Sequence, residues 1–135
     1  MRVVICGSPH WTYDRIVEDL ILRLRKESHA KGKELLIIHG GEPGPETVAR
    51  HLCTKIGIDT VIYPAHKAMG DLGYKRRNQI MLQEHAVDLV VVFAHVLNEN
   101  SVVCDMLERA NRKGIKIKPI DYYYITNKSS GNLII

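Results

Sequence analysis

Short apolar runs alternate along this chain with longer segments in which apolar residues recur at helical spacing. The runs are rich in valine, isoleucine and leucine, as buried strands are. They predict five strands, at residues 2–7, 34–39, 59–64, 88–94 and 116–120. Four helices are predicted between the strands, at residues 11–30, 44–56, 74–85 and 101–112.

The alternation of strands and helices with short connections is typical of a parallel sheet that helices cover on both faces. We therefore expect a Rossmann-like, doubly wound α/β fold with a mainly parallel sheet of five strands or more. Pro119 cannot donate a backbone hydrogen bond, so the last strand should lie at an edge of the sheet. No linker divides the 135 residues, and a single domain should span residues 1–120. Residues 121–135 form a tail that fits an added strand, a hairpin or an oligomer contact.

The composition excludes several classes of protein. The chain is 45% hydrophobic and 25% charged, which is ordinary for a globular domain and unlike a disordered chain. Its longest apolar run, residues 89–94, is far shorter than the roughly 20 residues that a membrane span needs. Too few residues precede Gly7 for a signal peptide. Three scattered cysteines predict reduced thiols and a cytoplasmic protein. The net charge of +4 mildly favours an anionic partner.

Unusual residues gather where the predicted strands end. In folds of this class a ligand binds outside the carboxyl ends of the strands, where helix N-termini suit an anion. The glycines after the second strand would let the backbone approach a ligand closely, although a tight turn without a ligand explains them equally well. The candidate ligand-binding residues at these ends are Gly7, Ser8 and Trp11 after the first strand, His39, Gly40, Gly41, Gly44 and Glu46 after the second, and Ser101 at the start of the last helix.

A basic run precedes the fourth strand. Lys75, Arg76 and Arg77 are expected to open a helix, and Asn78 follows them. Cations oppose the helix dipole at that place, and a phosphate or carboxylate ligand would relieve the conflict. A solvated basic turn is the alternative. Arg76, Arg77 and Asn78 are therefore candidate ligand-binding residues.

Other special residues point away from metal and redox chemistry. His10, His39 and His95 each follow a strand, but they lack the spacing of a zinc site and have no cysteine partner. We therefore expect no metal site and no tightly bound cofactor. No acidic residue follows the second strand where it would hold the ribose of NAD, which argues against a dinucleotide oxidoreductase. Trp11, the only tryptophan, fits either the core or a platform for a nucleobase.

These segments together resemble the SLOG superfamily of Rossmann-like nucleotide-binding domains, especially its stand-alone YspA-type members. The resemblance covers residues 2–120 and lies in the order and spacing of five segments: Cys-Gly-Ser-Pro-His-Trp at 6–11, His-Gly-Gly-Glu-Pro-Gly-Pro-Glu at 39–46, Arg77-Asn78 with Met81, residues 88–93 and residues 105–115. It implies a nucleotide-binding fold. Related LOG phosphoribohydrolases cleave the N-glycosidic bond of a nucleoside monophosphate, using an arginine that Arg77 matches and a glutamate in a glycine-rich loop. DprA-type relatives bind single-stranded DNA.

The chain departs from that pattern before its last helix. Val102 and Val103 stand where the family carries the Gly-Thr of its phosphate loop, and Met106 falls near the catalytic glutamate. Valine lacks the backbone freedom of glycine, and methionine cannot replace a carboxylate in acid–base chemistry. Asp105 is adjacent in sequence but about 100° away around the helix. These differences weigh against hydrolysis of the LOG type.

Three hypotheses of function follow. The first is binding of a nucleotide or nucleotide-derived ligand by a sensor, carrier or sequestering protein that forms a homo-oligomer. The alternative is an N-glycosidic hydrolase in which Arg77 contacts the phosphate and Glu46 or Glu99 supplies the carboxylate. The third is binding of a single-stranded nucleic acid along the basic residues at 75–77 and 112–118.

Overall fold

The computed structural model describes residues 1–98 and 100–121. Glu99, a candidate carboxylate, and residues 122–135 of the expected tail lie outside the described residues. One parallel sheet has the strand order β3-β2-β1-β4-β5. Its strands are β1 (Arg2–Gly7), β2 (Leu36–His39), β3 (Asp59–Ile62), β4 (Leu89–Phe93) and β5 (Lys116–Ile120). The helices are α1 (Asp14–Ala30), α2 (Pro45–Ile56), α3 (Asp71–Glu84) and α4 (Ser101–Arg112), with a short 3-10 helix, η1 (Lys67–Met69).

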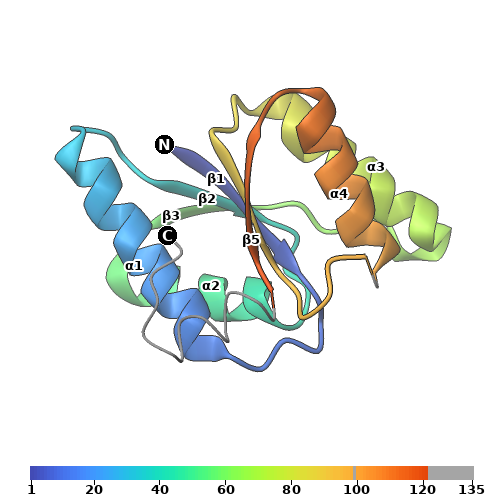
Figure 1. Ribbon diagram of the computed structural model, residues 1–135, viewed down its shortest axis with the longest axis horizontal. Helices are drawn as coiled ribbons and strands as arrows, with labels where there is room; N and C mark the ends of the chain where they lie inside the picture. Colours follow the sequence, from blue (N-terminus) through green and yellow to red (C-terminus); the bar gives the residue numbers. More distant parts are fainter. Residues whose placement is uncertain (99, 122–135) are drawn as a thin grey trace.

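This topology confirms the predicted Rossmann-like α/β fold, and β5 with its Pro119 lies at an edge of the sheet. Helices cover both faces: α1 and α2 pack on one, and α3 and α4 on the other (Figure 1). Successive residues of β1 alternate between the two cores, because strand side chains point to opposite faces. Val3 and Ile5 face α1 and α2, whereas Val4 faces α3 and α4, and all three are fully buried. Burial of each such side chain contributes about 1.5–3 kcal/mol.

The strand order reverses between β1 and β4. From β1 the chain moves outward through β2 to β3, and then crosses to β4 on the other side of β1. At the end of β1, the Ser8 N–H donates a hydrogen bond to the Phe93 carbonyl oxygen at 2.9 Å. A Cβ at Gly7 would overlap that oxygen, so this close approach of β1 and β4 requires a glycine. The carboxyl ends of β1 and β4 therefore border the crevice in which folds of this type bind ligands.

The start of α3 differs from the prediction. The sequence pattern placed it at residue 74, but the helix begins at Asp71, so the prediction that the basic run at 75–77 opens a helix is wrong. The run lies in the second turn, and Lys75 forms an ion pair with Asp71 at 3.2 Å. Gly73 hid the true start because glycine has a low helix propensity. It is required there, since a Cβ would overlap the carbonyl oxygen of His66.

The remaining predicted boundaries agree with the structure to within three residues. All three cysteines, Cys6, Cys53 and Cys104, are free thiols, as the scattered pattern predicted. In the part of the chain that the structure describes, every helix is too short or too polar to cross a membrane.

Candidate functional site

A cavity of about 320 Å³ opens beside the carboxyl ends of β1 and β2, against the N-terminal turns of α3 and α4. This volume lies at the low end of the range of about 300–1,000 Å³ that small-molecule sites occupy. Four of the predicted ligand-binding residues line it: Gly7, Glu46, Arg77 and Asn78. The fold therefore brings together residues from three separate segments of the sequence.

Arg77 is the buried cation of this cavity, with only 7% of its surface exposed. Its Nη1 donates to the carbonyl oxygen of Tyr63 at 3.4 Å, and its Nε donates to Oδ1 of Asn78 at 3.3 Å. Glu42 Oε1 lies 4.0 Å from Nη1, and the ring centroid of Tyr74 lies 5.5 Å from Cζ. These hydrogen bonds are long, and a guanidinium has five N–H donors. Arg77 therefore keeps hydrogen-bonding capacity for a ligand.

Glu46 lies in the first turn of α2 and is 3% exposed. Its Oε1 accepts a hydrogen bond from the backbone N–H of Gly40 at 2.5 Å. Burial raises the pKa of Glu46 to about 7, although the Gly40 bond and the charge of Arg77 act in the opposite direction. A Cβ at Gly40 would overlap Nη1 of Arg77 and would lie 3.1 Å from Oε1 of Glu46. The guanidinium and the carboxyl group therefore both pack against Gly40.

Asn78 joins Arg77 to the neighbouring helix. Asn78 is only 2% exposed. Its Nδ2 donates hydrogen bonds to the Val102 carbonyl oxygen at 3.0 Å and to Asp105 Oδ2 at 3.2 Å. The same Asp105 oxygen accepts a bond from Arg109 Nε at 2.8 Å. Asn78 therefore holds α3 to α4 and orients the guanidinium beside it.

The N-terminus of α4 forms the apolar wall of the cavity. Val102, Val103 and Met106 line it, and Met106 is 1% exposed. Oδ1 of Asn100 accepts hydrogen bonds from the N–H groups of Val102 at 2.9 Å and Val103 at 3.1 Å. Asp105 is turned toward Asn78 and Arg109. The N–H groups of Val102 and Val103 are therefore capped by the chain itself.

The other predicted residues do not line this cavity: Ser8, Trp11, His39, Gly40, Gly41, Gly44, Arg76 and Ser101. Trp11, 3% exposed, belongs to the core, and its Nε1 donates to the carbonyl oxygen of Tyr13 at 3.1 Å. Gly44 has a φ of +95°, and a Cβ there would come within 2.6 Å of the Ser8 carbonyl oxygen. Gly40 and Gly44 thus allow close contacts between protein groups.

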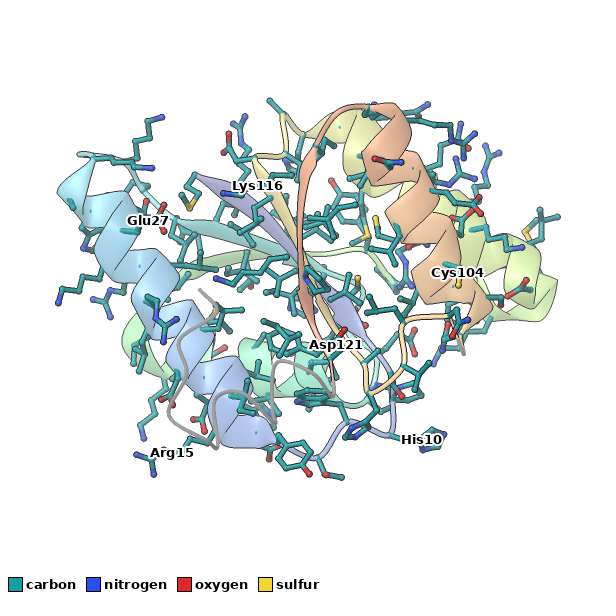
Figure 2. The ribbon with its side chains drawn as sticks, in the orientation of Figure 1. His10, Arg15, Glu27, Cys104, Lys116 and Asp121 are labelled. Carbon is teal, nitrogen blue, oxygen red and sulfur yellow. The ribbon has the colours of Figure 1, made fainter. Side chains whose placement is uncertain are left out.

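The predicted histidines are dispersed. His39 is fully buried; its Nδ1 accepts a hydrogen bond from the Gly41 N–H at 2.9 Å, and its Nε2 has no hydrogen-bond partner in the described residues. Burial, together with the charges of Arg50 and Arg77, lowers the pKa of His39 to about 4. His10 points away from the body of the protein (Figure 2). Across residues 1–98 and 100–121, no three side chains of the metal-ligating types are grouped to hold an ion.

Sequence reasoning missed several residues of the cavity wall. Glu42, Asp71 and Tyr74 line the cavity. Two of these residues carried a usable signal. Glu42 directly follows the glycine pair that ends β2, and Tyr74 precedes Arg77 by three residues, which places both on one face of a helix.

Comparisons with known proteins add no relative: no protein-family model, no curated protein and no solved structure matches this chain.

Proposed function

We propose that this chain binds a nucleotide or nucleotide-derived small molecule in the cavity and acts as a sensor, carrier or sequestering protein. The observation that carries this proposal is the packing of Arg77 and Glu46 against Gly40 at the cavity wall. The guanidinium offers hydrogen-bond donors to the oxygen atoms of ribose or phosphate, and the carboxyl group offers an acceptor to ribose hydroxyls. The cavity lies at the carboxyl end of β1, one of the two strands between which the order reverses, and this place supports the same function.

The sequence resemblance supports the proposal independently of the geometry. The segments at 6–11, 39–46 and 77–78 carry the resemblance to SLOG-type nucleotide-binding domains, and each of them contributes residues to the cavity wall. A ligand of nucleotide origin therefore fits both the position of the cavity and the pattern of the sequence.

Hydrolysis of an N-glycosidic bond is the second candidate, and the buried carboxyl of Glu46 favours it. With a pKa near 7, Glu46 can hold or release a proton at neutral pH, as an acid–base catalyst must. In such a reaction a water oxygen bonds to the anomeric carbon, the carbon–nitrogen bond breaks, and the leaving base takes up a proton. The sequence resemblance places Met106 near the catalytic glutamate of the related hydrolases, and methionine cannot do acid–base work there. Binding without turnover therefore remains our first proposal.

Nucleic-acid binding ranks last among the three functions. Arg77, the third residue of the basic run at 75–77, is only 7% exposed, so a polymer backbone would have poor access to it.

A thermal-shift screen tests the proposed function. The panel contains nucleosides, nucleoside mono-, di- and triphosphates, cyclic dinucleotides and ADP-ribose derivatives. A ligand at 100 times its dissociation constant should add about 2.7 kcal/mol to the free energy of unfolding and raise the melting temperature by several degrees. Chromatography of each positive sample for free base or ribose phosphate separates a binder from a hydrolase. A panel that leaves the melting temperature unchanged would contradict the proposal.

A further inference from the structure

Two backbone donors in the first turn of α4 are already used by the chain itself. Helix N-termini bind phosphate through backbone N–H groups that no other acceptor uses. In this chain the side chain of Asn100 accepts bonds from both Val102 and Val103, at 2.9 and 3.1 Å. A phosphate that entered here would have to displace an internal cap.

The charges around the cavity also disfavour an added anion. Three carboxyl groups line it, those of Glu42, Glu46 and Asp71, whereas Arg77 is the one cation among the described residues of the wall. Glu42 Oε1 lies 4.0 Å from Nη1 of Arg77, so much of the guanidinium charge is already compensated. Hydrogen bonds from Ser101 and Lys75 hold the pKa of Asp71 below its ordinary value, so this carboxylate is ionised at neutral pH. A phosphate dianion in the cavity would be repelled by these carboxylates, of which Asp71 is partly compensated by Lys75 at 3.2 Å.

We propose that the group that occupies this cavity is a neutral, hydroxyl-bearing sugar, such as the ribose of a nucleoside, and that the cavity discriminates against a phosphate on that sugar. The inference rests on the proposed function, because it names the class of ligand for the same site. The carboxylates of Glu42 and Asp71 accept hydrogen bonds from sugar hydroxyls, and Arg77 donates to sugar oxygens. The volume of about 320 Å³ suits a sugar with part of an attached base.

The protonation of Glu46 also favours a neutral sugar over a phosphate. Its carboxyl group is buried and close to Arg77, and its pKa lies near 7. A nearby dianion would raise this pKa further and would force the site to take up a proton on binding. A neutral sugar has no such effect. Near neutral pH, nucleotide binding would therefore be coupled to proton uptake, and nucleoside binding would not.

Calorimetric titration with four matched pairs tests the inference: adenosine, guanosine, cytidine and uridine, each against its own 5′-monophosphate. At least one nucleoside should bind about tenfold more tightly than its monophosphate. Glu42→Gln removes a negative charge and Asn100→Ala frees two N–H groups, so each should improve monophosphate binding relative to nucleoside binding by several-fold. Glu34→Gln is the control, because it makes the same charge change at an exposed residue away from the cavity. It should leave the ratio of monophosphate affinity to nucleoside affinity unchanged.

The outcomes separate this inference from the function on which it rests. A monophosphate that binds more tightly than its nucleoside would overturn the preference for a neutral sugar and would leave nucleotide binding intact. The preference would also be overturned if neither Glu42→Gln nor Asn100→Ala changed the ratio of monophosphate affinity to nucleoside affinity. Each variant tests the preference by itself, so the test survives if one of them folds poorly. The absence of binding by any of the eight compounds would overturn both.

Discussion

The guanidinium of Arg77 packs against Gly40 and occupies the space that a side chain at residue 40 would fill. The same glycine donates its backbone N–H to Glu46. A glycine at the end of β2 therefore allows a cation from α3 and a carboxyl group from α2 to meet beside the cavity. The charged part of the candidate site depends on this absence of a Cβ.

Gly40→Ala should displace the guanidinium and destabilise the fold by about 1–3 kcal/mol, because overpacking of a filled site has that cost. A double-mutant cycle with Arg77→Ala checks the cause by urea denaturation. Removal of the guanidinium leaves room for the new methyl group, so Gly40→Ala should cost less in the Arg77→Ala background. If the losses in unfolding free energy from the two substitutions were additive, room for the guanidinium would not be the reason for a glycine at residue 40.

Glu46 should make stability fall as the pH rises. Its folded pKa of about 7 lies above the ordinary value of 4.5, so the folded protein binds more protons between these values than the unfolded chain does. The stabilisation is fully present below pH 4.5 and is lost as the pH rises to about 7, by at most about 1.4 kcal/mol per pH unit. Glu46→Gln should become progressively more stable relative to the wild type across this window. Equal pH profiles for the two proteins, measured by urea denaturation, would contradict the assignment.

His39 should act in the opposite sense. Its folded pKa of about 4 lies below the ordinary value of 6.5, so the unfolded chain binds more protons between these values. Stability should therefore be lost as the pH falls from about 6.5 toward 4. His39→Asn, whose oxygen can accept the Gly41 bond, should lose less stability on acidification than the wild type. His10→Asn, at an exposed position, serves as the control and should follow the wild-type profile.

Asn78→Ala should destabilise the protein by about 1–3 kcal/mol, because it leaves the partly buried Asp105 oxygen and the Val102 carbonyl with fewer donors. It should also weaken ligand binding, since Nε of Arg77 loses its acceptor. Gln79→Ala, at the next position of α3, is the matched control for stability and affinity. An Asn78→Ala protein as stable as that control would show that the link between α3 and α4 contributes little.

The fold could be predicted because each strand and most helices carry their own local pattern. Val3, Val4 and Ile5 are buried on both faces of the sheet, and an uninterrupted apolar run predicts that burial. The local pattern did not predict the start of α3. Gly73 has a low helix propensity, but the position requires glycine because the carbonyl oxygen of His66 lies where a Cβ would be. That contact joins residues from different elements, and sequence periodicity does not encode it.

The candidate site could be predicted only in part for a related reason. The basic run before β4 predicts Arg77 and Asn78, the segment after β2 predicts Glu46, and all three residues line the cavity. The glycines after β2 suggested a backbone cradle for a ligand, but Gly40 instead accommodates Arg77. Which N–H groups of α4 the Asn100 side chain caps depends on side-chain geometry, which the sequence pattern does not encode.

The most direct test of the central claim is calorimetric titration of the Arg77→Lys and Arg76→Lys proteins with the compound that gives the largest thermal shift. Lysine keeps the charge but loses the planar array of donors, so Arg77→Lys should bind at least about tenfold more weakly than the wild type. Arg76 is exposed and lies outside the cavity wall, so Arg76→Lys should bind as the wild type does. A folded Arg77→Lys protein with wild-type affinity would contradict the account.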